Sequence, residues 1–345
     1  MTSPTDAFSV STDLFGDLVA SEGAPVDKIA ALAEYARQIA AKAKSANTKR
    51  SYRSQWATYL RYCDNLGLKP LSGDPEVVGL FLAALHRDGK RLSTIRSHLS
   101  AVSTAHRLAG LHLDLTDRAI HTVLQGLKRE MGVRPVKEAP PLLDTALKVY
   151  LSAFGTDGSH AWRNRFLILV GFGAALRRSE IVGLDLDDVV IGTQGLTLTL
   201  RRSKTDQIGE GAVIAIYRAE DPDLCVVTAL ERWLDFRGRD PGPLFLRIFK
   251  GGRVGTTRLT DRSVWEIVNG AAVKLGWKHH GLSPHSLRAG LITSASLKRI
   301  SLDEIMPQSR HRSYTTARKY VRNADAWRCN VTELLFARPA KPSQF

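Results

Sequence analysis

A proline-containing segment at residues 131–142, MGVRPVKEAPPL, interrupts the periodic patterns of this chain. Its three prolines prevent it from joining a helix on either side, and no apolar period runs through it. The parts before and after it are each long enough to bury a core. We therefore predict two domains, at residues 26–130 and 143–345, joined by a linker at 131–142. The small, polar and acidic residues 1–25 indicate a disordered tail.

Apolar side chains at helical spacing predict an all-helical N-terminal domain. Trp56, Tyr59 and Cys63, for example, fall on one face of a helix that Gly67 ends. Asn47 and Ser93 are residue types that cap helix N-termini, so we expect helices to begin there. The expected helices lie at residues 26–43, 47–66, 75–86, 93–109 and 116–129.

The C-terminal domain combines helical periods with a short alternating segment. Leu196, Leu198 and Leu200 alternate with threonines, which predicts a half-buried strand, and residues 212–216 predict its hairpin partner. Helices are expected at residues 143–154, 162–176, 226–236, 261–275, 285–297, 302–305, 315–322 and 326–336. The predicted fold class is therefore mainly α in two domains, the second being α+β, mostly helical with one small antiparallel sheet.

The net charge of +15 indicates a polyanionic partner, with nucleic acid ahead of an anionic membrane. A solvated basic face without a partner is the alternative. The longest apolar stretch, at 166–176, is too short to span a bilayer, and the N-terminus has no signal-peptide pattern. The three cysteines form no CxxC pair, so we expect no disulfide framework and no metal site. The expected protein is soluble and cytoplasmic, without a membrane partner.

His285 and Arg288 form the first candidate anion site. Ser283 and Pro284 predict a helix start just before them, and a spacing of three residues puts both side chains on one face of its first turns. Free backbone N–H groups at a helix N-terminus also favour an anion. The alternative is a surface histidine and arginine with no shared task.

Arg177 and Glu180 repeat this three-residue spacing after a strongly apolar segment. A guanidinium at the edge of a core needs an anionic partner, which is a bound phosphate or simply Glu180. Lys204 follows the first predicted strand, where its long side chain can reach a ligand or merely protect the sheet edge.

His311 and Tyr320 complete the candidate set. His311 lies in a basic turn, and Tyr320 lies in a predicted helix between Arg318 and Arg322. A helical tyrosine is usually a packed aromatic side chain. Here the basic neighbours attract a phosphate and favour the phenolate.

In this order and spacing, the set Arg177, Lys204, His285-x-x-Arg288, His311 and Tyr320 resembles the signature of the tyrosine recombinases, also called the phage integrase family. The resemblance covers about residues 27–337. It implies a SAM-like core-binding N-terminal domain, a catalytic C-terminal domain, and a reaction on DNA that needs no cofactor, metal or small-molecule substrate.

The resemblance also implies a role for each residue. Tyr320 would attack a DNA phosphorus to give a 3′-phosphotyrosine and a free 5′-hydroxyl. The other residues would stabilise charge or move protons: Arg177 and Arg288 on the non-bridging oxygens, His285 as general base or charge stabiliser, Lys204 as general acid, His311 as donor to the phosphate, and Glu180 as an orienting group.

Double-stranded DNA with inverted repeats is the implied partner, bound by both domains and by a homotetramer in which residues 326–336 dock into a neighbouring subunit. The implied location is the nucleoid. The candidate DNA contacts are Lys49, Arg50 and Arg53, which we place on the helix face away from Trp56, together with Arg96, Ser97 and Arg262. Two alternatives are a type IB topoisomerase and a non-catalytic DNA-binding protein.

Overall fold

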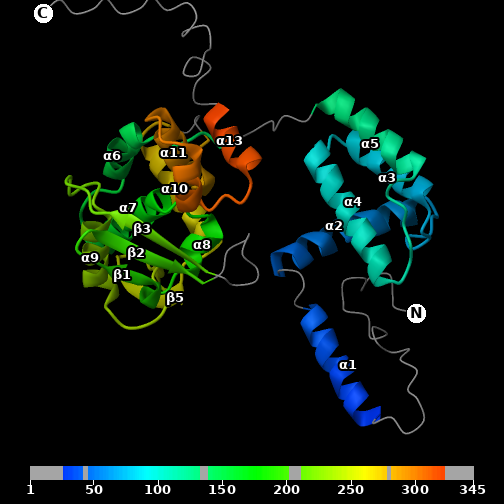
Figure 1. Cartoon of the computed structure of the whole chain (residues 1–345), viewed down its shortest axis with the longest axis horizontal. Helices are drawn as coiled ribbons and strands as arrows, with labels where there is room; N and C mark the ends of the chain where they lie inside the picture. Colours follow the sequence, from blue (N-terminus) through cyan, green and yellow to red (C-terminus); the bar gives the residue numbers. More distant parts are fainter. Residues whose placement is uncertain (1–25, 42–45, 133–138, 202–210, 278–280, 323–345) are drawn as a thin grey trace, which may run out of the picture. The chain divides into compact units, whose positions relative to one another are not determined.

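The computed structural model describes residues 26–41, 46–132, 139–201, 211–277 and 281–322. The chain forms two compact units that divide between Val136 and Lys137, inside the predicted linker. Figure 1 shows an N-terminal unit built of helices and a C-terminal unit that combines helices with strands. The predicted fold class is confirmed.

The described part of the N-terminal unit is entirely helical. Its core is aromatic: Trp56, Tyr59 and Phe81 are buried, and the rings of Tyr59 and Phe81 meet edge to face, with 4.9 Å between their centroids. Burial of such rings supplies much of the apolar area that stabilises a small helical domain. The helices are α1 (Val26–Ala41), α2 (Ala46–Asn65), α3 (Pro75–Arg87), α4 (Leu92–Leu108) and α5 (Arg118–Met131).

The two caps predicted for this unit are wrong. Asn47 lies inside α2, and Ser93 lies inside α4, whose N-cap is Arg91 without a side-chain hydrogen bond. The side chains that do cap are aspartates: Asp74 accepts from the backbone of α3, and Asp117 accepts from that of α5. Residue type alone therefore did not locate these two helix starts.

Helix α7 lies at the centre of the C-terminal unit, and its residues from Arg165 to Phe172 are all buried. Helix α7 packs against α8, α9 and α11, which explains why this segment shows no amphipathic period. The helices are α6 (Asp144–Ser152), α7 (Gly158–Gly173), α8 (Arg178–Gly183), the 3₁₀ turn η2 (Leu186–Asp188), α9 (Val226–Arg237), α10 (Asp261–Lys274), α11 (Pro284–Leu297), α12 (Leu302–Ser309) and α13 (Tyr314–Arg322).

Two small antiparallel sheets complete this unit, where the sequence predicts one. The predicted hairpin is present as β2 (Gly195–Leu200) and β3 (Ala212–Tyr217), and β1 (Val189–Ile191) extends it to three strands. The second sheet pairs β4 (Leu246–Ile248) with β5 (Val254–Arg258). These strands of three and five residues show little apolar alternation, so the sequence did not predict the second sheet.

The end of the predicted linker is attached to α11. The backbone N–H of Leu142 donates to the carbonyl of Ser286 over 3.0 Å, and the Leu142 side chain is buried. Gly290 lies one turn further along α11, where an added Cβ would stand only 2.0 Å from the Leu142 carbonyl oxygen. Glycine is therefore required at this close approach of two backbones.

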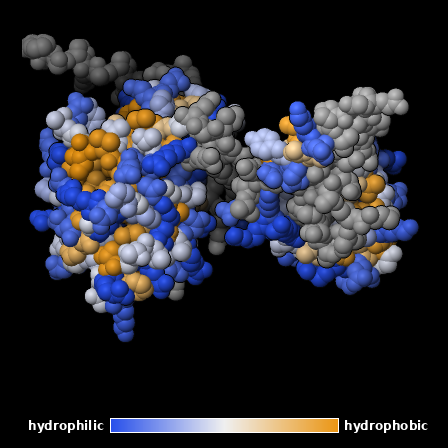
Figure 2. Space-filling view, turned by 90° about the horizontal axis from the view of Figure 1, so that it is seen from below, coloured by the Kyte–Doolittle hydropathy of each residue, from blue (hydrophilic) through white to orange (hydrophobic). Residues whose placement is uncertain are grey.

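Hydrophilic residues cover most of the face shown in Figure 2, and the apolar residues form separate areas on it. This distribution is typical of a surface exposed to water. Of the helices in the described ranges, none has both the length and the apolar composition that crossing a membrane requires.

Candidate active site

The turn between α7 and α8 positions Arg177 and Glu180. Arg177 is the N-cap of α8, and the Glu180 carboxylate accepts from its backbone N–H over 2.8 Å and from its Nη1 over 2.7 Å. The Glu180 side chain is only 2% exposed, while that of Arg177 is 20% exposed. The carboxylate thus holds the backbone of Arg177 in place, while the Arg177 side chain is still partly exposed to solvent.

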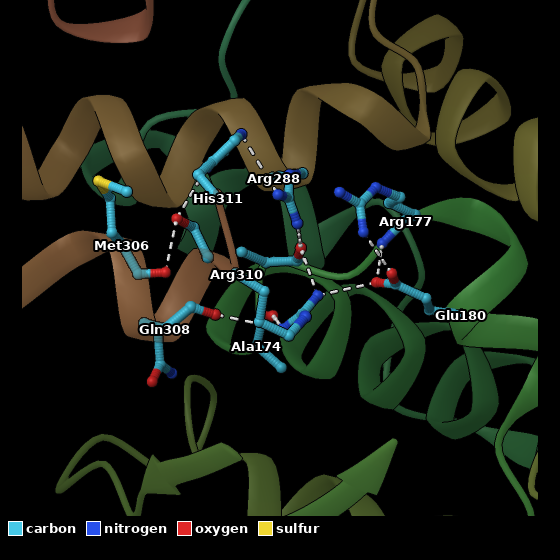
Figure 3. Close-up of polar contacts among 10 residues, drawn as sticks. Ala174, Arg177, Glu180, Arg288, Met306, Gln308, Arg310 and His311 are labelled. Carbon is cyan, nitrogen blue, oxygen red and sulfur yellow. Dashed lines mark hydrogen bonds and ion pairs between the residues drawn. The ribbon is translucent and has the colours of Figure 1, made fainter. Parts of the chain in front are cut away.

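Helix α11 positions His285 and Arg288, because Ser283 precedes it as N-cap and Pro284 is its first residue. His285 is exposed, whereas Arg288 is fully buried and donates from Nη1 to the carbonyl of Ala175 over 2.7 Å. Its Nη2 lies 3.3 Å from Nε2 of His311 (Figure 3). Arg288 therefore connects α11 to both of the turns that carry candidate residues.

His311 follows α12 and is half-buried. A guanidinium has no acceptor, so Nε2 of His311 must accept the hydrogen bond from Arg288. Nδ1 then carries the proton and donates to the Ser309 hydroxyl, 2.9 Å away. In this structure His311 is a neutral imidazole whose Nε2 is used as an acceptor.

Tyr320 extends from α13 toward this group. Its hydroxyl oxygen lies 2.8 Å from Nε2 of His285, and its ring centroid lies 5.5 Å from that of His311. With Nε2 of a neutral His285 unprotonated, this nitrogen accepts a hydrogen bond from the phenolic O–H. A candidate nucleophile and a candidate base are thus within hydrogen-bond distance.

Burial and neighbouring cations set the protonation of these groups. Burial lowers the pKa of His311 to about 4, and the cations of Arg288 and Arg177 act in the same direction. Burial likewise lowers the pKa of Arg288 to about 10, which leaves it charged at neutral pH. Burial acts to raise the pKa of Glu180, but Arg310 and Arg177 outweigh it and hold that pKa below its usual range.

The structure brings six of the seven predicted catalytic residues into one connected group. They are Arg177, Glu180, His285, Arg288, His311 and Tyr320. Lys204 lies outside the described residues, as does the predicted helix at 326–336. Over the ranges that are described, no three His, Cys, Asp or Glu side chains are grouped so as to hold a metal ion.

Ser309 and Arg310 contact this group although the sequence analysis assigned neither. Ser309 is fully buried beside His311, and Arg310 donates to the Glu180 carboxylate over 2.8 Å. Their signal in the sequence was weak, because both belong to the basic turn that contains His311 and their partners are set by the fold.

The predicted DNA contacts lie on α2, α4 and α10. Arg50, Arg53 and Arg96 are exposed, but Lys49 is half-buried. Its predicted placement away from Trp56 is wrong, because seven residues make two helical turns and return to the same face.

The remaining two candidates are held by neighbours. Ser97 accepts a hydrogen bond from Gln55 over 2.7 Å. Arg262 pairs with Glu266 over 2.8 Å and lies over the ring of Trp265.

The two units match different families. Residues 137–326 match the phage integrase family, and residues 32–109 match the family described as phage integrase, N-terminal SAM-like domain. The chain is 30% identical to an integrase/recombinase xerD homolog of Selenomonas ruminantium, over 86% of this chain and 87% of that protein. It is 31% identical to tyrosine recombinase XerD of Mycobacterium leprae, over 80% of this chain and 86% of that protein.

Solved structures share the fold. The XerH site-specific recombinase bound to a palindromic difH substrate superposes with a TM-score of 0.63 at 16% identity, covering 97% of each chain. A lambda integrase (75–356) dimer bound to a COC′ core site gives a TM-score of 0.57 at 20% identity, covering 84% of this chain and 93% of that one.

Proposed function

Because the chain belongs to the phage integrase family, we propose that it is a site-specific tyrosine recombinase that cleaves and rejoins DNA through a covalent bond to Tyr320. One observation carries the proposal. The Tyr320 hydroxyl lies 2.8 Å from Nε2 of His285, beside His311 and the buried Arg288. This proximity supports the proposal, in which Tyr320 is the nucleophile, His285 the base and Arg288 a cation for phosphate oxygens.

In the proposed cleavage step, the Tyr320 oxygen attacks a backbone phosphorus while His285 accepts the phenolic proton. The P–O5′ bond breaks, leaving a 3′-phosphotyrosine, and the departing 5′-oxygen takes a proton from Lys204. Arg177 and Arg288 offset the charge that develops on the non-bridging oxygens. Because a phosphodiester is exchanged for a phosphotyrosine ester, the reverse attack by a 5′-hydroxyl rejoins DNA without an added energy source.

His311 has to change its hydrogen bonding to act in this step. Donation from Nε2 to a phosphate oxygen requires a proton where the Arg288 contact now uses a lone pair. An anionic phosphate favours that proton, because a nearby negative charge raises the pKa of an imidazole. We therefore assign His311 as a donor that becomes available when the phosphate binds, with Glu180 orienting Arg177.

We propose that both units contact DNA. The contacts are assigned to Lys49, Arg50, Arg53, Arg96, Ser97 and Arg262, of which the four arginines are exposed. The net charge of +15 supports such a partner. Arg262 at the start of α10 is the candidate for reading a guanine, since a bidentate arginine suits its N7 and O6.

The assembly is part of the same proposal. We infer a homotetramer acting on two inverted-repeat sites, with residues 326–336 docked into the next subunit, in a cytoplasmic, nucleoid-associated protein. We also propose an organisation like that of Cre recombinase, based on sequence similarity in segments such as residues 94–110 and 320–325. Cre has tryptophan where this chain has His311, so the phosphate contact at that position is proposed from the wider family pattern.

The test uses a nicked duplex carrying two short inverted repeats, taken from the DNA that flanks the gene. We expect a covalent protein–DNA complex that survives detergent and disappears on protease treatment. Tyr320→Phe should abolish it, with a loss of at least about 10⁴-fold in cleavage rate. The matched control is Tyr314→Phe, an exposed tyrosine at the start of the same helix.

Each alternative gives a different result. A covalent complex that persists in Tyr320→Phe overturns the assignment of the nucleophile. Specific binding without any covalent complex indicates a non-catalytic DNA-binding protein. Relaxation of plasmids that lack the repeats indicates a type IB topoisomerase.

A further inference from the structure

Arg310 connects the turn that carries His311 to the turn that carries Arg177 (Figure 3). Its Nη1 donates to the carbonyl of Ala174 over 2.8 Å, and its Nη2 donates to the Glu180 carboxylate over 2.8 Å and to the Ala175 carbonyl over 3.2 Å. The side chain is only 9% exposed. Both terminal nitrogens are directed at the protein, which distinguishes Arg310 from the more exposed Arg177.

The turn that Arg310 holds has an unusual backbone. Ala175 has a φ of 47°, a left-handed conformation that costs a non-glycine residue free energy. Its carbonyl accepts from two arginines, Arg288 over 2.7 Å and Arg310 over 3.2 Å. Arg310 therefore stabilises a strained peptide two residues before Arg177, and it shares an acceptor with Arg288.

The backbone of Arg310 is itself left-handed, with a φ of 55°. This conformation ends α12 and turns the chain so that the next residue, His311, lies beside Arg288. Glycine is the residue usually found in this conformation, since it has no Cβ to clash. The unfavourable conformational free energy of an arginine here is offset by the hydrogen bonds of its guanidinium to Glu180 and to the backbone carbonyls of Ala174 and Ala175.

Charge gives the guanidinium a second task. Arg177, Arg288 and Arg310 surround one buried carboxylate, that of Glu180. Oε1 of Glu180 is bonded by the Arg177 side chain, while Oε2 is shared by the Arg177 backbone and Arg310. Without Arg310, Arg177 would be the one cation hydrogen-bonded to this carboxylate among the described residues, and that pair would compete with a phosphate for Arg177.

We propose that Arg310 is a positioning residue for the cleavage reaction, an inference that rests on the proposed function. It fixes Arg177, Glu180 and His311 relative to one another before DNA binds, and it leaves Arg177 available to the phosphate. Arg310 does not itself contact the phosphate, since its terminal nitrogens are taken up by Glu180 and by backbone carbonyls. Preorganisation of this kind acts on the rate of the chemical step more than on DNA binding.

Arg310→Gly removes the guanidinium and keeps the backbone conformation. We expect DNA binding within about twofold of wild type and a single-turnover cleavage rate lower by about 10²-fold, the loss typical of a misplaced catalytic group. Guanidinium ions at non-denaturing concentration should restore part of the rate by occupying the vacated space. Arg310→Lys should be intermediate, because one ammonium cannot reach both Glu180 and two carbonyls.

Arg299→Gly is the matched control. Arg299 also has a left-handed backbone, with a φ of 63°, and it is exposed at the end of α11. Its replacement tests the relief of backbone strain alone, so we expect an unchanged cleavage rate.

The pH profile gives a readout that a purely structural role would not affect. Arg310 is the foremost cation that lowers the pKa of Glu180, so its loss raises that pKa. The acid limb of the cleavage rate should then move to higher pH in Arg310→Gly, and toward its wild-type position in Arg310→Lys. If Arg310→Gly does not fold, Arg310→Lys decides by the same measurements.

Three outcomes would overturn the proposal: cleavage at the wild-type rate in Arg310→Gly, a parallel loss of binding and rate, or a reduced rate with neither rescue nor a shift in the pH profile. Absence of a covalent complex with the wild-type protein would instead reject the proposed function, before any Arg310 variant is compared.

Discussion

The two units of this protein bury different kinds of polar side chain. The N-terminal unit buries His98 and His106, each with one ring nitrogen that finds no hydrogen-bond partner within the described ranges. The C-terminal unit buries charged groups, among them Glu180 and Arg288, and gives each of them partners. A neutral ring tolerates a missing hydrogen bond at moderate cost, whereas a buried charge does not. The C-terminal unit is therefore the one in which a single substitution leaves an uncompensated charge.

Glu180→Gln tests this difference most strongly. The substitution keeps the shape of the side chain but leaves Arg177 and Arg310 without their shared anion. We expect a loss of about 3–5 kcal/mol in the free energy of unfolding of the C-terminal unit. Urea unfolding followed by hydrogen exchange separates the response of the two units.

Glu304→Gln is the matched control, because Glu304 accepts from the N-cap backbone of α12 in the same way but is exposed. It should cost no more than about 1 kcal/mol. Similar losses in the two variants would show that buried charge has no special weight in this unit. In wild type the contribution of Glu180 should be complete above about pH 4.5 and should disappear as the pH falls through its lowered folded pKa.

Arg288→Met separates stability from activity in the same unit. Methionine replaces a buried cation that lies near Arg177 and Arg310, and the Ala175 carbonyl keeps its bond from Arg310. We expect a change in unfolding free energy of less than about 1 kcal/mol, because Glu180 keeps its hydrogen bonds to Arg177 and Arg310 and no buried charge is left without a partner. Single-turnover cleavage should fall by about 10²–10³-fold, because one donor to the transition state is lost. A large loss of unfolding free energy together with a cleavage rate close to that of wild type would contradict this expectation.

Mild acid should destabilise the N-terminal unit. Burial lowers the pKa of His98 and His106 in the folded state, so protonation favours unfolding. Their contribution is complete above the unfolded pKa of about 6.5 and is lost as the pH falls below it, by at most about 1.4 kcal/mol per pH unit for each histidine. Hydrogen exchange corrected for its intrinsic pH dependence should show α4 losing protection between about pH 6.5 and 5.

The double variant His98→Gln/His106→Gln should flatten this pH dependence. An unchanged slope would show that the acid response of the N-terminal unit has another origin. The C-terminal unit also has two histidines whose pKa burial lowers, His160 and His311, and the same experiment measures its acid response for comparison.

Loss of a hydrogen bond from a neutral amide in the N-terminal unit should have the smallest effect, as in Gln55→Ala and Gln38→Ala. The Gln55 amide donates to Ser97 and links α2 to α4, a neutral contact whose loss is worth about 1 kcal/mol. Gln38→Ala removes an exposed contact to Glu34 on α1 and should cost less than about 0.5 kcal/mol. Urea unfolding measures both, and a loss above 3 kcal/mol in Gln55→Ala would place this neutral contact on a par with the buried charges.

Apolar periodicity predicted most of this fold, because a helix at the surface of a unit buries one face whatever its partner is. The face containing Trp56 and Tyr59 is buried as predicted. Helix starts were less predictable, since Asn47 and Ser93 are suitable cap residues that the backbone does not use. The second sheet escaped prediction because β4 and β5 are too short for alternation to be visible.

The candidate site was predictable as far as its residues resemble a known pattern. Glu180 and Arg177 are three residues apart, so their pairing was visible in the sequence as an alternative to phosphate binding. Arg310 was not, because its partners at Ala174 and Glu180 lie 130 residues or more before it. The hydrogen bonding of His311 likewise depends on where α11 places Arg288.

The backbone contact between Leu142 and α11 has a mechanical consequence. A hydrogen bond and a glycine contact clamp the C-terminal end of the interdomain segment to the helix that holds His285 and Arg288. A force along the interdomain segment would therefore act first on α11, the helix that carries His285 and Arg288. Movement of the interdomain segment and the alignment of His285 and Arg288 are thus coupled through the contact between Leu142 and α11.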